Sequence, residues 1–149
     1  MINKMTFAGG GTMLDSLKMQ MKDTGVNAEF TGFVARDALS GIYSNSHLLI
    51  LPSRSEGFPK VIAEAAAYGC VPVVSDISSI SQFFGSDASI FLKEITPEGI
   101  ADAVDIAIND RVQLKQRSEK CMELAGNFTY SHYINLLKTE ILGMGNDKS

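Results

Sequence analysis

Residues 48–74 read LLILPSRSEGFPKVIAEAAAYGCVPVV, and this stretch decides the fold class. Its two ends, Leu48–Leu51 and Val71–Val74, are nearly continuous apolar runs, which are typical of strands covered by helices on both faces. Between them, apolar residues recur at helical spacing and stop near Gly69, so we expect a helix there. A strand, a helix and a second strand in this order predict a parallel pair joined by a right-handed crossover.

The same alternation continues on both sides of this stretch. We expect five short strands, at Met5–Ala8, Ala28–Thr31, His47–Leu51, Val71–Ser75 and Ser89–Leu92. Helices are expected at Thr12–Thr24, with Thr12 as N-cap and Gly25 as C-terminal stop, at Arg36–Ser44, and repeatedly from Pro97 onward. The prediction is an α/β, three-layer domain with a mainly parallel sheet and a helical C-terminal tail.

Composition and charge exclude several function classes. The chain has 149 residues, of which 45% are hydrophobic and 20% charged, so it can form a core and is not wholly disordered. Its net charge of −4 argues against nucleic-acid binding. No apolar run approaches the roughly 18 residues of a membrane span. Cys70 and Cys121 form neither a disulfide framework nor a metal-ligand spacing. We expect a cytoplasmic domain.

Three segments follow the carboxyl ends of predicted strands, where doubly wound sheets bind their ligands. They are Gly9–Gly11, Gly32–Val34 and Pro52–Lys60. In the third, Gly57 permits a tight turn and Pro59 suits the first turn of a helix. The following N–H groups, together with Arg54 or Lys60, then suit a diphosphate. The glycines of the first segment are equally compatible with a simple turn.

Glu56 and Glu64 stand eight residues apart around the start of this helix. Glu64 lies among alanines, where a buried carboxylate needs a partner. A sugar diol could supply two hydrogen bonds to it, and a nearby Lys or Arg is the simpler structural alternative. Glu56 could equally be a loop residue whose negative charge interacts favourably with the N-terminal end of the helix dipole.

Here the sequence resembles a family. Residues 53–65, Ser53-Arg54-Ser55-Glu56-Gly57-Phe58-Pro59-Lys60-Val61-Ile62-Ala63-Glu64-Ala65, resemble the E-x7-E motif of GT4-type glycosyltransferases (glycosyl transferases group 1), which have the GT-B fold. Four flanking blocks agree in order and spacing: Ala8–Gly11, Phe30–Val34, Leu51–Ser53 and Gly69–Val74. The resemblance extends from about Met5 to about Phe128.

This resemblance implies the Rossmann-like, donor-binding C-terminal domain of a retaining glycosyltransferase that uses a nucleoside-diphosphate sugar. Glu56 would contact the transferred sugar as the catalytic residue, and Glu64 would bind the ribose hydroxyls. The remaining residues expected around the nucleotide are Gly57, Phe58, Lys60, Arg54, Ser53, Phe33, Val34, Gly10 and Gly11. No metal or other cofactor is expected, and the context would be polysaccharide or glycolipid assembly.

The resemblance also implies partners. The N-terminal acceptor domain and the first strand–helix unit of this domain, which carries an Arg and a Lys for the diphosphate, are not in the sequence. We therefore expect residues 1–128 to form a partial domain, residues 129–142 its C-terminal helix and residues 143–149 a disordered tail. The order 3-2-1-4-5-6 places the missing strand centrally, so the flanking strands must pair directly or leave their edges exposed. We expect rearranged pairing, or a gap filled by a partner chain, including a second copy. The full-length protein could associate with a membrane.

Two other functions remain compatible with the sequence. A domain of this fold could have lost its site and serve in assembly, which the absent phosphate-binding unit would explain. A sugar-nucleotide epimerase of the GT-B fold would share the sheet, because fold alone does not assign function. We expect transfer of a hexosyl group, with no transfer by these 149 residues alone.

Overall fold

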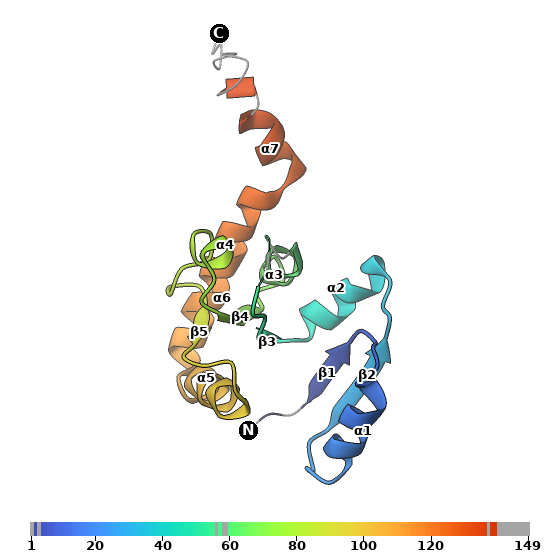
Figure 1. Ribbon diagram of the computed structural model, residues 1–149. Coiled ribbons are helices and arrows are strands. Elements are labelled where there is room, and N and C mark those ends of the chain that lie inside the picture. The colour runs from blue at the N-terminus through green and yellow to red at the C-terminus, as the bar shows by residue number, and fades with distance from the viewer. Residues whose placement is uncertain (1, 3, 56, 58–59, 137, 140–149) are drawn as a thin grey trace. The chain divides into compact units, whose positions relative to one another are not determined.

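The computed structural model describes residues 2, 4–55, 57, 60–136 and 138–139. Strands and helices alternate along the chain (Figure 1), and the chain divides into two compact units, Met1–Asn45 and Ser46–Ser149. All pairings between its named strands are parallel. The predicted α/β class with a mainly parallel arrangement and a helical C-terminal end is therefore confirmed.

The first unit contains two strands and two helices. These are β1 (Met5–Ala8), α1 (Leu14–Lys22), β2 (Ala28–Gly32) and α2 (Arg36–Ser44). The rings of Phe7 and Phe30, which lie opposite each other in the register, are stacked with centroids 4.7 Å apart. The expected N-cap at Thr12 is wrong, because the N-cap is Met13 and its side chain makes no capping bond. Instead, the Gly11 carbonyl accepts from the Leu14 N–H at 3.2 Å, so the preceding turn satisfies this donor.

The second unit contains three strands and most of the helices. These are β3 (Leu48–Leu51), α3 (Lys60–Ala66), β4 (Val71–Ser75), α4 (Ser78–Ser81), β5 (Ile90–Leu92), α5 (Pro97–Asn109), α6 (Arg111–Ala125), the 3-10 helix η1 (Gly126–Phe128) and α7 (Tyr130–Leu136). All five predicted strands are found, with ends that differ by at most one residue. The sequence analysis did not predict α4.

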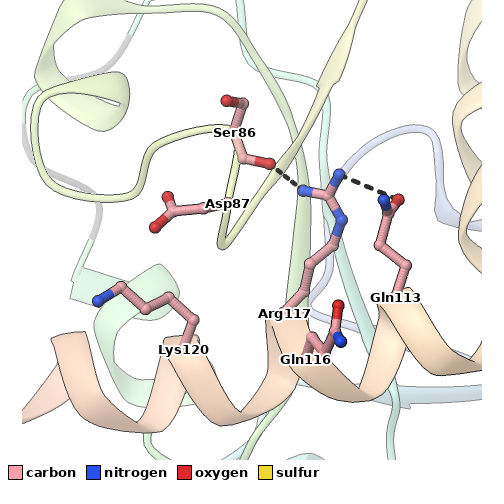
Figure 2. A pocket seen from close by; sticks show the side chains of 6 residues that line it. All are labelled: Ser86, Asp87, Gln113, Gln116, Arg117 and Lys120. Carbon is pink, nitrogen blue, oxygen red and sulfur yellow. Dashed lines mark hydrogen bonds between the residues drawn. The ribbon is translucent and has the colours of Figure 1, made fainter.

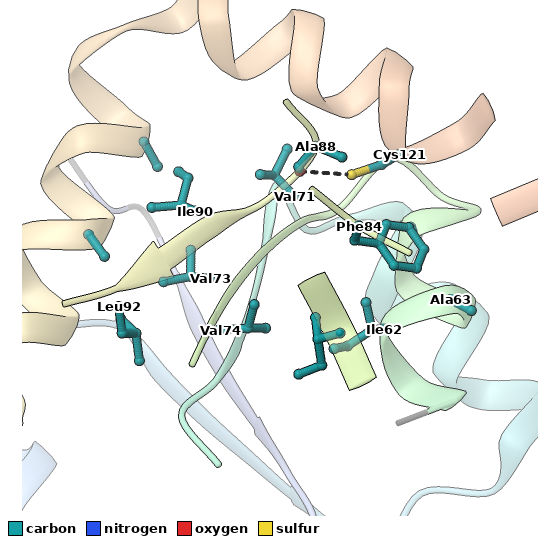
Figure 3. Close-up of a cluster of buried hydrophobic side chains, with 14 of the residues drawn as sticks. Ile62, Ala63, Val71, Val73, Val74, Phe84, Ala88, Ile90, Leu92 and Cys121 are labelled. Atoms are coloured by element: carbon teal, nitrogen blue, oxygen red, sulfur yellow. Dashed lines mark hydrogen bonds between the residues drawn. The ribbon is translucent and has the colours of Figure 1, made fainter. Parts of the chain in front are cut away.

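The core of the second unit surrounds β4, the central strand of the order β3-β4-β5. Every residue of β4 is buried, as its continuous apolar run predicts. Figure 3 shows Val74 beside Ile62 of α3, while Val73 lies toward Ile90. Because successive strand residues point to opposite faces, helices are needed on both sides of the sheet. Phe84, which follows α4, is also completely buried.

The strands form two sheets, β1-β2 and β3-β4-β5, rather than one. Direct pairing between the two groups, one of the expected alternatives, is not found among the described residues. In the order 3-2-1-4-5-6, strands 2 and 3 lie on one side of strand 1, and strands 4, 5 and 6 lie on the other. If strand 1 is the missing strand, β1 and β2 correspond to the first group, and β3, β4 and β5 to the second. The partner-strand alternative stays a prediction.

The expected domain boundaries also stay predictions. Helix α7 (Tyr130–Leu136) lies within the range 129–142 in which a helix is expected. Residue 137, residues 140–142 and the expected tail at 143–149 lie outside the described residues. Among the residues that the structure describes, no helix has the length and apolar character needed to cross a membrane.

Candidate functional site

The segment after β3 holds several of the predicted site residues. The Ser53 N–H donates to the Leu51 carbonyl at 3.0 Å and turns the chain away from the strand. Ser53 is half-buried, while Arg54 and Lys60 are exposed. Glu56, Phe58 and Pro59 lie outside the described residues, so the expectations for them are untested. The guanidinium of Arg54 and the ammonium of Lys60 are thus accessible to an anion from solvent.

Helix α3 presents one polar face and one buried face. Ile62, Ala63, Ala65 and Ala66 are buried against the core, whereas Lys60 is exposed and Glu64 half-buried. The spacing of four residues puts Lys60 and Glu64 on the same face, with an axial separation of about 6 Å. The Lys60 ammonium and the Glu64 carboxylate therefore lie on one face of α3, about one turn apart, in the helix that follows β3.

A tightly constrained turn ends α3. Gly69 has φ +80°, and its N–H donates to the Ala66 carbonyl at 2.9 Å, while the Cys70 N–H donates to the Ala65 carbonyl at 3.1 Å. The carbonyl of Gly69 in turn accepts a hydrogen bond from the Ser118 hydroxyl of α6 at 2.7 Å. The backbone angle favours glycine, and a Cβ at Gly69 would lie 2.7 Å from that hydroxyl oxygen, so the Ser118 hydroxyl would have to move.

Gly57 lies between two residues that the structure does not describe, because Glu56 precedes it and Phe58 follows it. Gly57 itself is exposed. The tight turn expected at this position therefore stays a prediction.

In the first unit, the structure brings two predicted segments together. The Gly9 N–H donates to the Gly32 carbonyl at 2.8 Å, and Gly9 has φ +122°. Gly9 and Gly32 are in contact, and they directly precede Gly10 and Phe33 in the sequence. This contact brings the segment of Gly10 and Gly11 close to that of Phe33. The Phe33 side chain is 94% exposed and Val34 is half-buried. A ring this exposed offers a flat apolar surface on which a base could stack.

The cysteines do not form a reactive site. Both are free and buried, and burial raises the pKa of the Cys70 thiol to about 11 and that of Cys121 to about 12. The Cys70 thiol donates to the Ser46 carbonyl and the Cys121 thiol to the Ala88 carbonyl. The described residues also contain no group of three or more His, Cys, Asp or Glu that could hold a metal ion.

A pocket of about 410 Å³ lies elsewhere in the second unit (Figure 2). Its lining residues are Ser86, Asp87, Gln113, Gln116, Arg117 and Lys120. The Arg117 guanidinium donates to the carbonyls of Ser86 and Ser89, and the Lys120 ammonium is bonded to Glu123 at 2.8 Å. The loop in this pocket precedes β5, so it belongs to the amino edge of the sheet, opposite the edge that carries Ser53.

Two polar groups are not predicted by the sequence motifs. The Ser75 hydroxyl, at the carboxyl end of β4, is buried and finds no hydrogen-bond partner among the described residues. A serine that ends an otherwise apolar strand was the available signal. Ser118 was missed because its partner lies 49 residues away, and no local pattern reveals such a contact.

Residues 3–125 match the family model described as glycosyl transferases group 1. The chain belongs to this family. An uncharacterized glycosyltransferase of Methanocaldococcus jannaschii is 32% identical over 110 residues, which are 72% of this chain and 28% of the relative. A 2-deoxystreptamine N-acetyl-D-glucosaminyltransferase of Niallia circulans is 29% identical over 141 residues, covering 89% of this chain and 36% of that protein. A GDP-mannose-dependent mannosyltransferase of Mycobacterium tuberculosis, which acts on phosphatidylinositol dimannoside, is 29% identical over 102 residues, covering 68% of this chain and 26% of that protein.

Solved glycosyltransferase structures share the fold. The catalytic domain of a cholesterol-α-glucosyltransferase from Helicobacter pylori matches with a TM-score of 0.73 at 22% identity, covering 85% of this chain and 79% of that chain. Sucrose-phosphate synthase from Thermosynechococcus elongatus matches with the same TM-score of 0.73 at 16% identity, covering 94% of this chain and 37% of that chain. The GT-B fold expected from the sequence motifs is thus confirmed. The chain spans between 26% and 36% of these three sequence relatives.

Proposed function

We propose that this chain is the donor-binding part of a retaining glycosyltransferase, which transfers a hexosyl group from a nucleoside-diphosphate sugar to an acceptor hydroxyl. The observation that carries the proposal is the polar face of α3, where Lys60 and Glu64 lie one turn apart after the carboxyl end of β3. That edge is where doubly wound sheets bind nucleotides. The mannosyl and N-acetylglucosaminyl transfer named for the two relatives supports the hexosyl class.

Each residue would have a separate role in holding the donor. The Glu64 carboxylate would accept hydrogen bonds from both ribose hydroxyls, since an ionised carboxylate has room for two donors. Lys60 and Arg54 would neutralise the diphosphate, helped by backbone N–H groups near Gly57 and Lys60. Phe33 and Val34, with Ser53 and Arg54, would border the base, and Gly10 and Gly11 would also contact the nucleotide. Glu56 would contact the transferred sugar and act as the catalytic residue.

The reaction then depends on how well the departing nucleoside diphosphate is stabilised. The bond from the anomeric carbon to the diphosphate oxygen breaks, the bond to the acceptor oxygen forms on the same face, and the acceptor proton is released. Positive groups aimed at the departing oxygens lower this barrier because the charge develops in the transition state. Lys60 and Arg54 are the cations of this segment available for that task. We propose that no metal or other cofactor takes part.

Other parts of the enzyme would supply the acceptor site. We propose an N-terminal acceptor domain as partner, and a strand that completes the sheet, provided by the rest of the protein or by a second copy of the chain. Consequently the 149 residues would bind the nucleotide but would not complete a transfer. The setting would be the assembly of a polysaccharide or glycolipid in the cytoplasm or at the inner face of a membrane.

Titration of the chain with UDP, GDP and ADP, followed by ligand-observed NMR, tests this proposal. We expect one nucleotide to bind and the Glu64→Ala variant to lose about tenfold or more in affinity, as for a charged hydrogen-bonding partner. Glu119→Ala, which removes an exposed carboxylate from α6, is the matched control and should bind like the unmodified chain. If none of the three nucleotides binds, the proposed site is wrong. Equal binding by the Glu64→Ala variant would remove Glu64 from it.

A further inference from the structure

Helix α6 makes a set of side-chain contacts with backbone carbonyls of the sheet connections. Arg117 and Cys121 donate to carbonyls of the loop before β5. Ser118 donates to a carbonyl at the end of the α3–β4 connection. Among the hydrogen bonds that these three side chains donate to backbone carbonyls of the described residues, that of Ser118 ends on the connection after α3. Those of Arg117 and Cys121 end on the segment Ser86–Ser89.

Ser118 contacts the turn that follows α3, at a glycine with a left-handed backbone conformation. Its hydroxyl lies 2.7 Å from the Gly69 carbonyl oxygen, and Gly69 is buried with φ +80°. Gly69 and Cys70 donate back to Ala66 and Ala65, so the last turn of α3 is tied to the residue that Ser118 holds. Met122, one turn further along α6, would also touch a Cβ placed at Gly69, at 3.7 Å.

This anchoring matters because α3 is short. The helix has seven residues, less than the roughly 12–15 at which an isolated helix becomes even marginally stable, so tertiary contacts must fix its position. Its buried face consists mainly of alanine, whose small side chain makes few packing contacts. Glu64 precedes the anchored Gly69 by five residues, so a shift of that turn moves the carboxylate with it.

We propose that Ser118 is a positioning residue for nucleotide binding: its hydrogen bond to Gly69 fixes α3 and thereby places the Glu64 carboxylate. This inference rests on the proposed function. It adds a residue on α6, outside the segment that touches the nucleotide, to the residues that determine affinity. Ser118 itself touches no part of the nucleotide.

The test compares Ser118→Ala with Ser118→Thr, which keeps the hydroxyl, and with Arg117→Gln, which disturbs α6 at the loop before β5. Amide exchange of Gly69 and Cys70 in the free chain is the first measurement. We expect Ser118→Ala to raise the exchange rate of these amides. Ser118→Thr and Arg117→Gln should exchange at the rate of the unmodified chain. Unchanged exchange in Ser118→Ala would overturn the proposal, whether or not any nucleotide binds.

Affinity for the nucleotide is the second measurement, made with whichever of UDP, GDP and ADP binds and with its 2′,3′-dideoxy analogue. Ser118→Ala should weaken binding of the nucleotide by roughly 3- to 10-fold, the equivalent of one hydrogen bond, and leave binding of the analogue unchanged. A general loss of structure would weaken both, and this result would overturn the positioning role. Absence of nucleotide binding by the unmodified chain would contradict the proposed function, while the exchange result would still decide the anchoring.

Discussion

Gly69 holds the turn after α3 in a left-handed backbone conformation. Its φ of +80° disfavours any side chain, and a built Cβ would lie 2.7 Å from the Ser118 oxygen, so this hydroxyl would have to shift. We therefore expect Gly69→Ala to lower the free energy of unfolding by about 2 kcal/mol or more, measured by urea denaturation. Gly126→Ala is the control, because Gly126 has φ −56° and open space around it. Similar small effects at both glycines would contradict the geometry.

The thiols of Cys70 and Cys121 predict how stability depends on alkaline pH. Burial raises the pKa of these groups in the folded chain to about 11 and about 12, from an ordinary 9.0. Above about pH 9 the unfolded chain loses thiol protons that the folded chain keeps, so stability falls as pH rises. Urea midpoints measured between about pH 8 and about pH 10.5 should therefore decrease. A Cys70→Ala/Cys121→Ala double variant should show a flatter decrease, and an equally steep one would contradict this explanation.

At the scale of single residues, the sequence predicted which segments matter better than why. Lys60 and Glu64 were identified from motif spacing and share a helix face in the structure. The tight turn expected at Gly57 stays a prediction, because the residues on both sides of it lie outside the described part of the chain. Ser118 was invisible because hydrogen bonds across 49 residues leave no periodic pattern in a sequence.

At the scale of elements, α6 begins with a clear capping signal. The Asp110 carboxylate accepts from the Gln113 N–H at 2.9 Å and so satisfies one of the free donors of the first turn. Asp110→Ala should lower the free energy of unfolding by about 1 kcal/mol, and Asp110→Asn by much less, as measured by thermal or urea unfolding. Asp105→Ala, on the exposed side of α5, is the control and should change stability little. Equal losses in Asp110→Ala and Asp105→Ala would rule out the cap.

Elements with long apolar patterns were predictable and short polar ones were not. Buried β4 was found with its correct bounds because four of its five residues are apolar. Helix α4, with the sequence Ser-Ser-Ile-Ser, has one buried apolar residue and no period to detect. The start of α1 was misplaced because a backbone carbonyl, which no residue type signals, satisfies its first donor.

At the scale of the whole molecule, the two units differ in how much they bury. Among the residues that the structure describes, nearly all buried hydrophobic ones belong to the second unit, and Tyr43 is the one that belongs to the first. A two-stranded sheet has little stability by itself. We therefore expect the amides of β1 and β2 to exchange faster than those of β4, measured by hydrogen exchange and mass spectrometry. Equal protection of β2 and β4 would contradict this difference.

The family and fold were predictable from five ordered sequence blocks, because these blocks mark strand ends and the helix between β3 and β4. The direct pairing of the two groups of strands, one of the expected alternatives, is not found among the described residues, and nothing local in the sequence indicates which strand would join them. For this chain, the proposed function depends on the contact between the Glu64 carboxylate and the ribose hydroxyls.

That claim is tested most directly by a double comparison of binding free energies. The tightest-binding nucleotide among UDP, GDP and ADP and its 2′,3′-dideoxy analogue are titrated against the unmodified chain and against Glu64→Ala. Removing the ribose hydroxyls should weaken binding to the unmodified chain by about tenfold and leave binding to Glu64→Ala unchanged, because the two groups are partners in one interaction. An equal loss in both proteins would show that Glu64 does not bind the ribose.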